Sequence, residues 1–196
     1  VGDEAEFEGH MLEVTLGPGM LSRNYDGLQN DLDKMEGVFL KRGEYTFPLD
    51  NDKLWDFKPL AKVGDKVTAG GWLGEVDENF QPHKIMVPFT FKGEYTVKSL
   101  KEAGQYTIGE VIAVLTDEAG KDVEVTMIQR WPVKRAITCY KEKPRPYKLL
   151  ETGVRTIDTV NPIVEGGTGF IPGPFGTGKT VLQHAISKQA EADIVI

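Results

Sequence analysis

The chain has 196 residues and a formal net charge of −7, because 23 lysines and arginines stand against 30 aspartates and glutamates. This length allows one or two domains, and a hydrophobic share of 40% is too high for a disordered chain. No stretch approaches the roughly 18 apolar residues of a membrane-spanning helix. The acidic balance argues against holding a polyanion by bulk charge. We therefore expect neither a nucleic-acid partner nor direct insertion into a membrane.

Cysteine and histidine usage excludes two further classes of protein. The single cysteine, Cys139, rules out an internal disulfide and fits a reducing compartment. The three histidines lie far apart and have no metal-ligand spacing. The chain starts at Val1 and stops at Ile196 inside an expected strand, so we expect a piece cut from a longer protein.

The first 59 residues show only one clear strand pattern. Residues 11–16 predict a strand, which ends at the Gly-Pro-Gly of residues 17–19. Residues 20–35 carry apolar side chains at intervals of three and four, which predicts a short helix or a helical turn. Residues 36–59 are charged and contain prolines, so we expect a connector with little regular structure.

Residues 60–129 have the pattern of a compact β unit, with glycine-containing turns between short apolar runs. The clearest run is 122–128, where Val123, Val125 and Met127 alternate with polar residues, the period of a half-buried strand. This spacing predicts a small barrel or sandwich. The other expected strands are 84–90, 95–100 and 110–115.

After the charged, proline-bearing segment 141–148, the pattern changes to strand, loop, helix and strand. The loop fits the phosphate-binding motif G-x-x-x-x-G-K-[ST] at each fixed position. Residues 168–171 predict a strand before it, and 194–196 a buried parallel strand after the helix. The eight loop residues are Gly173, Pro174, Phe175, Gly176, Thr177, Gly178, Lys179 and Thr180.

Each fixed position of this loop has a chemical reason. The three glycines let the backbone turn tightly and approach a ligand closely. Successive N–H groups then form an anion-binding nest, at which the next helix directs its positive end. Lys179 supplies a mobile charge for the β- and γ-phosphates, and the Thr180 hydroxyl is a ligand for Mg²⁺.

Several blocks of the chain resemble one known family, in the same order. The loop is close to that of the catalytic A subunit of V-type and archaeal-type rotary ATPases, including the bacterial V-type enzymes. That subunit usually has serine where Thr177 stands, and both are small hydroxyl residues. The other stretches that resemble the family are 16–21, 25–29, 39–43, 63–67, 129–133 and 152–158.

The resemblance implies a layout of domains. Residues 1–16 would end an N-terminal β-barrel, 17–59 would connect, and 60–130 would form the bulge or non-homologous domain. Residues 131–196 would begin a RecA-like nucleotide-binding domain. The expected fold class is therefore mainly β, with a small barrel or sandwich insertion followed by the truncated start of an α/β P-loop domain.

The resemblance also implies a function for the parent protein, which is ATP hydrolysis or synthesis coupled to H⁺ or Na⁺ transport. ATP or ADP would bind residues 173–180 and Val181, and Thr180 would contact Mg²⁺. The implied partners are the B subunit of the same complex, alternating with this one in a hexamer, and the central and peripheral stalk subunits. The implied location is cytoplasmic, peripheral to the cell membrane.

Family residues needed for turnover are absent from these 196 residues. By the resemblance, the catalytic carboxylate and the Mg²⁺-orienting aspartate would follow Ile196, and the arginine that reaches the transferred phosphate would come from the B subunit. We therefore expect no catalytic residue here and no meaningful ATP turnover. We also expect weak nucleotide affinity, with a poorly ordered or self-associated C-terminal third.

Other functions compete for the same residues. Residues 62–76 are similar to half of a biotinyl or lipoyl carrier, which would make Lys84 a modified lysine, although Pro82 and His83 precede it atypically. The acidic pair Asp77-Glu78 is expected to be a solvated loop, and Trp55, Trp72 and Trp131 to be packing anchors. A stand-alone β-rich interaction module with a non-functional loop is the alternative to the motor subunit.

Overall fold

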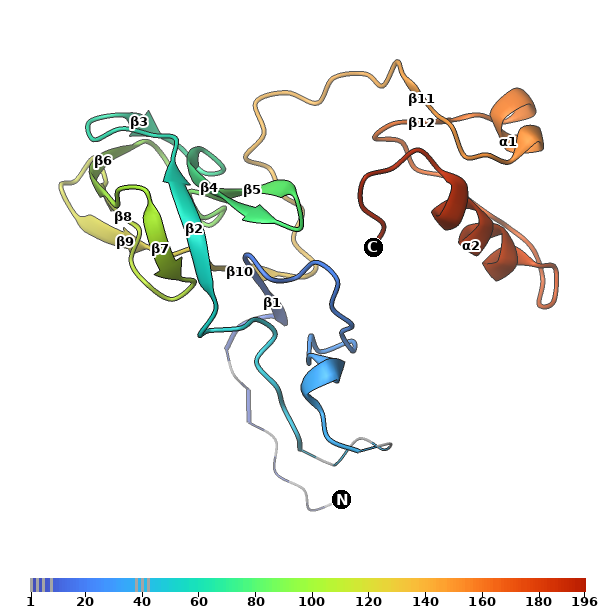
Figure 1. Cartoon of the computed structure of the whole chain (residues 1–196), viewed down its shortest axis with the longest axis horizontal. Helices are drawn as coiled ribbons and strands as arrows, with labels where there is room; N and C mark the ends of the chain where they lie inside the picture. Colours follow the sequence, from blue (N-terminus) through green and yellow to red (C-terminus); the bar gives the residue numbers. More distant parts are fainter. Residues whose placement is uncertain are drawn as a thin grey trace. The chain divides into compact units, whose positions relative to one another are not determined.

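The computed structural model describes residues 2, 4, 6, 7, 9–37, 39, 41 and 43–196. The chain divides into two units, residues 1–140 and 141–196, and each is described by itself (Figure 1). The expected barrel end at 1–16 and the family stretch 39–43 lie partly outside the described residues. Within those residues, no helix has both the length and the apolar character needed to cross a bilayer.

The first unit is built mainly from two antiparallel four-stranded sheets (Figure 1). One sheet has the order β5-β4-β2-β7, with β2 at Leu54–Pro59, β4 at Trp72–Glu78, β5 at Gln81–Met86 and β7 at Gly104–Thr107. The other has the order β3-β6-β8-β9, with β3 at Lys66–Val67, β6 at Tyr95–Leu100, β8 at Ala113–Thr116 and β9 at Asp122–Val125. A separate ladder pairs β1 (Glu13–Leu16) with β10 (Gln129–Pro132).

Two hydrophobic clusters stabilise this unit. One gathers Trp55 and Phe57 of β2 with Val76 and Ile85, and the other gathers Leu73 of β4 with side chains of the second sheet. The half-buried Leu100 packs against both clusters. The second cluster therefore joins the two sheets, and the burial of its apolar surface holds them together. Its other members are Val87, Val97, Ala113, Leu115 and Val125.

A glycine allows β2 and β4 to approach closely. The Phe57 ring, 1% exposed, lies across Gly74 at a register shift in the β4–β5 pairing. A Cβ atom at residue 74 would lie 2.2 Å from Cε2 of Phe57 and 2.8 Å from the Lys58 carbonyl oxygen. Both distances are far below van der Waals contact, so only glycine fits here without displacing the ring.

The strand predictions for the first unit are mostly confirmed. The structure has strands inside 11–16 and 122–128, one at 95–100, and strands that overlap 84–90 and 110–115 only in part. Val125 and Met127 are buried as the alternation predicted, and Val123 is half-buried. The expectation of a connector with little regular structure is wrong for β2, which is internal to its sheet. Its charged residues and proline hid the buried Trp55 and Phe57.

Of the short helix or helical turn expected over residues 20–35, the structure has only one 3-10 turn, η1, at Leu32–Lys34. The Asp26 carboxylate accepts hydrogen bonds from the backbone N–H groups of Leu28 and Asn30, both at 2.8 Å. Gln29 then takes a left-handed φ of +65°. An aspartate that bonds local amides in this way favours a turn over a helix.

Glu78 is buried, so its expected place in a solvated loop is wrong. The residue is 2% exposed, and its carboxylate accepts hydrogen bonds from the N–H groups of Gly19 at 2.7 Å and Leu21 at 3.0 Å. Nδ1 of His83 donates to the other oxygen at 2.6 Å. Burial alone would raise the pKa of Glu78, but the hydrogen bonds from His83, Leu21 and Gly19 outweigh it and lower the pKa. The residue fastens the 19–21 segment to the β4–β5 hairpin.

The second unit contains little regular structure besides its longest helix. It has β11 at Leu149–Leu150 paired with β12 at Ile163–Val164, α1 at Arg155–Val160 and α2 at Lys179–Gln189. The strands expected at 168–171 and 194–196 are wrong, since neither segment belongs to a ladder. A strand is defined by pairing, and an apolar run without a neighbouring strand in the described residues cannot form one.

The tryptophans divide between core and surface. Trp55 and Trp131 are buried, as predicted for packing anchors. Trp72 is 58% exposed, so that prediction is wrong for it. Its ring lies beneath the Lys84 ammonium, 4.9 Å from the ring centroid, which explains how a tryptophan is accommodated at the surface.

Replacing Gly74 by alanine should destabilise the first unit by about 3 kcal/mol, because the new methyl group overlaps the Phe57 ring. Denaturant unfolding followed by tryptophan fluorescence reports this unit, which holds all three tryptophans. Gly109→Ala is the matched control, since no atom lies within 4 Å of a Cβ there. Equal stability of the two variants would contradict the close approach.

Replacing Glu78 by glutamine should cost about 2 kcal/mol near pH 7, since the amides and His83 lose a charged acceptor. The lowered pKa of Glu78 means that its stabilisation is present above the unfolded value of about 4.3 and is lost as pH falls through the lower folded value. Wild type and variant should therefore converge in acid. Glu124→Gln, at an exposed position, serves as control, and a constant difference down to the lowest pH would oppose this account.

Candidate functional site

The glycines of the candidate loop take the backbone conformations that the motif requires. Gly176 and Gly178 have φ of +82°, and Gly173 has φ of +151°. A Cβ at residue 173 would lie 2.7 Å from Oγ1 of Thr177, so this position also requires the absence of a side chain. The chain thus turns back on itself between Gly173 and the first residue of α2.

Lys179 and Thr177 close the loop through the same carbonyl group. The Thr177 hydroxyl donates to the Pro174 oxygen at 2.8 Å, and the Lys179 ammonium donates to it at 2.7 Å. The ammonium also donates to the Gly173 oxygen. The charge of Lys179 is therefore held at the centre of the loop by two neutral carbonyl groups, which a phosphate can displace.

The amides at this turn have no acceptor in the described chain. No hydrogen bond is donated by the backbone N–H groups of residues 173–181 to a described residue, and the first helical bond runs from Leu182 to the Gly178 oxygen at 2.9 Å. Gly178, the N-cap, offers no side-chain cap. Free amides at the start of an 11-residue helix form a site suited to an anion, and the helix dipole adds to it.

Contacts at the other end of α2 hold the helix in its unit. A Cβ at Gly153 would lie 2.8 Å from Cβ of Gln189, and the Glu191 N–H donates to the Glu151 oxygen at 3.0 Å. Asp158 accepts hydrogen bonds from the Thr152 hydroxyl and amide and from the Gly153 amide, and these bonds lower its pKa. The 152–158 segment thereby supports the helix that carries the loop.

The structure brings together part of the expected site. Gly173, Pro174, Thr177 and Lys179 are joined by the hydrogen bonds above. Phe175 is fully exposed, and the hydroxyl-bearing Thr180 and the apolar Val181 are exposed at the first turn of α2. No hydrogen bond or ion pair joins any of these three to the Lys179 ammonium in the described residues, so their expected roles toward a nucleotide remain predictions.

Magnesium fits this site only together with a nucleotide. Thr180 offers one exposed hydroxyl oxygen, and no group of three potential ligands among His, Cys, Asp and Glu occurs within the described part of the chain. Mg²⁺ commonly takes few protein ligands and keeps substrate phosphates and waters as the rest. The residues present are therefore compatible with metal that arrives bound to phosphate oxygens.

The carrier alternative finds no support at Lys84. Its ammonium pairs with the carboxylate of Glu75 on the neighbouring strand, and both side chains are 25% exposed. A swinging-arm lysine has to be free at a hairpin tip, whereas Lys84 lies within β5. It acts here as a cross-strand partner.

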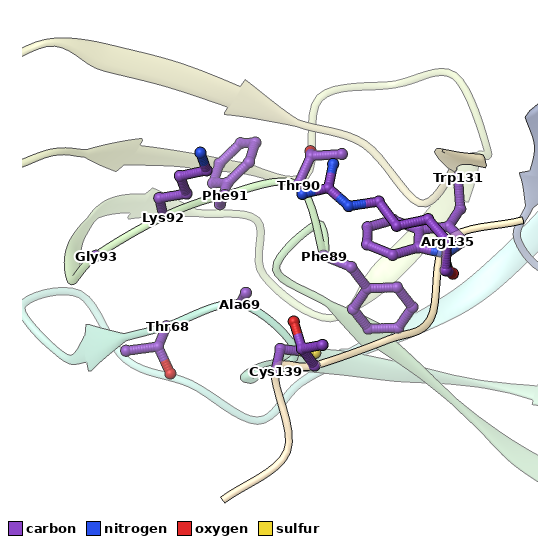
Figure 2. Close-up of a pocket in the computed structure, with 11 residues that line it drawn as sticks. Thr68, Ala69, Phe89, Thr90, Phe91, Lys92, Gly93, Trp131, Arg135 and Cys139 are labelled. Carbon is purple, nitrogen blue, oxygen red and sulfur yellow. The ribbon is translucent and has the colours of Figure 1, made fainter. Parts of the chain in front are cut away.

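Sequence reasoning missed a pocket of about 370 Å³ in the first unit. It is shown in Figure 2, and its wall includes Phe89, Trp131 and Arg135. The only signal was the adjacency of aromatic and basic residues near Arg130 and Trp131, which also fits a surface strand. The pocket forms because the 88–93 loop and the 133–139 segment, distant in sequence, lie side by side.

Comparison with known proteins assigns both units to one family. Residues 46–134 match the barrel-sandwich domain of ATP synthase alpha/beta subunits, and residues 153–196 match the nucleotide-binding domain of the ATP synthase alpha/beta family. The first match covers both four-stranded sheets, and the second covers the loop and α2. The expected fold class, mainly β followed by the start of a nucleotide-binding domain, is confirmed.

Individual relatives match over the whole chain. The V-type ATP synthase alpha chain of Treponema denticola is 50% identical, that of Borrelia garinii subsp. bavariensis 49%, and alpha chain 1 of Treponema pallidum 47%. Each match includes 100% of this chain but only 34% or 35% of the relative, so the chain spans about a third of their length. The chain belongs to the V-type ATP synthase alpha-chain family, and it spans the barrel-sandwich domain and the start of the nucleotide-binding domain.

Proposed function

We propose that residues 173–180 bind the phosphates of ATP or ADP, as part of a catalytic subunit of a rotary ATPase. The observation that carries the proposal is the set of acceptor-free amides at the start of α2, with the Lys179 ammonium beside them. Amides and an ammonium group arranged in this way neutralise phosphate charge through short hydrogen bonds. The family match at 153–196 supports the same assignment.

Binding would exchange one set of hydrogen bonds for another. The Lys179 ammonium leaves the carbonyls of Gly173 and Pro174 and moves to the β- and γ-phosphates, while Thr177 keeps its bond to Pro174 and preserves the turn. Thr180 would contribute its hydroxyl to Mg²⁺, which supplies charge neutralisation between phosphate oxygens. Phe175 and Val181 would line the approach to the loop.

The activity of the whole protein follows from its relatives and remains part of the proposal. Their name, V-type ATP synthase alpha chain, supports ATP hydrolysis or synthesis coupled to H⁺ or Na⁺ transport. We propose the B subunit, in an alternating hexamer, and the central and peripheral stalks as partners. The complex would place the chain on the cytoplasmic side, peripheral to the cell membrane. Within the whole protein, residues 60–130 would be the bulge and 131–196 the start of the RecA-like domain.

We further propose that the 196-residue chain does not turn over ATP by itself. Hydrolysis requires a group that positions the attacking water and another that stabilises the transferred phosphate. The sequence has no aspartate or glutamate from 166 to 190, so the loop and α2 offer no carboxylate for the first role.

A stand-alone interaction module is the second candidate, and the division into two units favours it. The first unit contains both hydrophobic clusters and both four-stranded sheets. Limited proteolysis with and without Mg-ATP separates the two functions. Nucleotide that protects bonds at 173–190 supports the binding loop, whereas unchanged cleavage there supports the module.

Replacing Lys179 by methionine should weaken ATP binding at least tenfold, because the amides lose the neighbouring positive charge. Affinity of the wild-type chain should itself be weaker than micromolar, so amide shifts in NMR titrations with Mg-ATP are the suitable measurement. Lys188→Met, in the last turn of the same helix, is the matched control. Equal affinity of the two variants would exclude the loop as the binding site.

The purified chain should release phosphate from Mg-ATP no faster than buffer does. A sensitive phosphate assay measures this, with the Lys179→Met variant as control for contaminating enzymes. Steady release that disappears in the variant would show that the chain carries its own catalytic groups, contrary to the proposal.

A further inference from the structure

The pocket of the first unit is an open depression with basic and aromatic walls. It measures about 370 Å³, and its lining contains Phe89, Phe91 and Trp131, three threonines, Lys92 and Arg135, but no aspartate or glutamate. This composition is notable in a chain with a net charge of −7. Two acids lie beside the rim: Glu118, whose Oε1 is 3.9 Å from a Cβ position at Gly93, and Glu94, which follows Gly93 in the chain and pairs with Lys66 at 2.6 Å.

The backbone at Arg135 is anchored, and its side chain lies beside the Trp131 ring. Its backbone N–H donates to the Pro132 oxygen at 3.0 Å, and its own carbonyl accepts from Nε1 of Trp131 at 2.8 Å. Its guanidinium lies 5.7 Å from the Trp131 ring centroid. In Figure 2 the side chain extends along Trp131 toward Thr90.

The floor beneath Arg135 is also held rigidly. Phe89 packs edge-on against Trp131 with ring centroids 5.6 Å apart. The Phe89 N–H donates to Oε1 of Gln129 at 2.9 Å, which ties the loop to β10. A preformed wall lowers the entropy that a ligand has to lose on binding.

The Arg135 guanidinium makes no hydrogen bond or ion pair with a described residue. Its one partner is the Trp131 ring, and that contact leaves the N–H donors at the guanidinium edge free. Residues 130–140 contain three cations and no acid. The guanidinium presents a planar set of N–H donors beside apolar rings. This arrangement is complementary to a carboxylate that lies next to an apolar side chain.

The segment beside the pocket offers unpaired backbone. Residues 136–140 have no regular secondary structure, and no hydrogen bond joins their backbone N–H or C=O groups to a described residue. Cys139 packs against the neighbouring loop, with Sγ 3.2 Å from a Cβ position at Gly70. A peptide lying along this segment gains main-chain hydrogen bonds as well as the side-chain contacts.

We propose that this pocket binds an acidic segment of a protein partner. A carboxylate of the segment pairs with Arg135, an apolar side chain next to it rests against Phe89 and Phe91, and its backbone runs along residues 136–140. Most of the lining is exposed, whereas small-molecule sites enclose most of their ligand, which favours a segment whose own protein covers the rim. The proposal does not depend on nucleotide binding at 173–180.

The test uses the whole chain and a dye-labelled, end-capped peptide of alternating glutamate and phenylalanine, followed by fluorescence anisotropy. The peptide should bind saturably, and its glutamine–phenylalanine counterpart should bind at least tenfold more weakly. Arg135→Gln should weaken binding at least tenfold and Lys92→Gln severalfold. Lys134→Gln removes an exposed cation one residue away and should stay within twofold of wild type.

A second measurement locates the peptide. Cys139 is the only cysteine and lines the pocket, so bound peptide should slow its alkylation in wild type and not in Arg135→Gln. Tryptophan fluorescence verifies that each variant is folded. The proposal is overturned by absent binding, by equal binding of the glutamine peptide, or by equal losses at residues 134 and 135. Complete displacement by inorganic phosphate at matched ionic strength, or Arg135-dependent binding to phosphatidylserine vesicles without peptide binding, overturns it too.

Discussion

Each backbone amide removed from water needs an acceptor, and in this chain side chains supply many of them outside the sheets. Glu78 serves the amides of Gly19 and Leu21, and Asp26 serves those of Leu28 and Asn30. Other acceptors are the amide oxygens of Gln29 and Gln129 and the carboxylate of Asp158. Polar side chains therefore satisfy backbone amides in the irregular segments that join the short strands, where no strand partner accepts from them.

The loop before α2 differs from these segments, because its backbone amides have no hydrogen-bond acceptor in the described chain. Its residues include no aspartate, glutamate, asparagine or glutamine between Gly173 and Thr180, so nothing local accepts from the amides. The one strong donor nearby, Lys179, bonds to carbonyl oxygens instead. The carbonyl oxygens thus accept hydrogen bonds from Lys179, and the amides have no acceptor in the described chain, which is the polarity that suits a phosphate.

Sequence patterns predicted the parts of the fold that depend on local rules. Alternation located the strand at 122–125 and the fixed glycines located the loop, because each reflects backbone geometry within a few residues. They failed at β2, Glu78 and residues 168–171 and 194–196, where the outcome depends on distant partners. Glu78 is buried because Gly19, far away in sequence, donates to it. Likewise, the pocket at Trp131 forms where two segments distant in sequence lie side by side, and no local sequence pattern predicts that they do.

The two proposed sites would bind anionic groups by different physical interactions, and the net charge explains why both would have to act at short range. At physiological salt, charges separated by more than about 8 Å are largely screened, so an overall charge of −7 neither attracts nor strongly repels a ligand already in contact. The loop relies on amide dipoles and one mobile ammonium, which suits a multiply charged phosphate chain. The Arg135 guanidinium instead lies beside an aromatic ring and presents a planar set of donors, which suits one planar carboxylate. A ligand that satisfies one arrangement would therefore match the other poorly, so the two proposals imply different specificities.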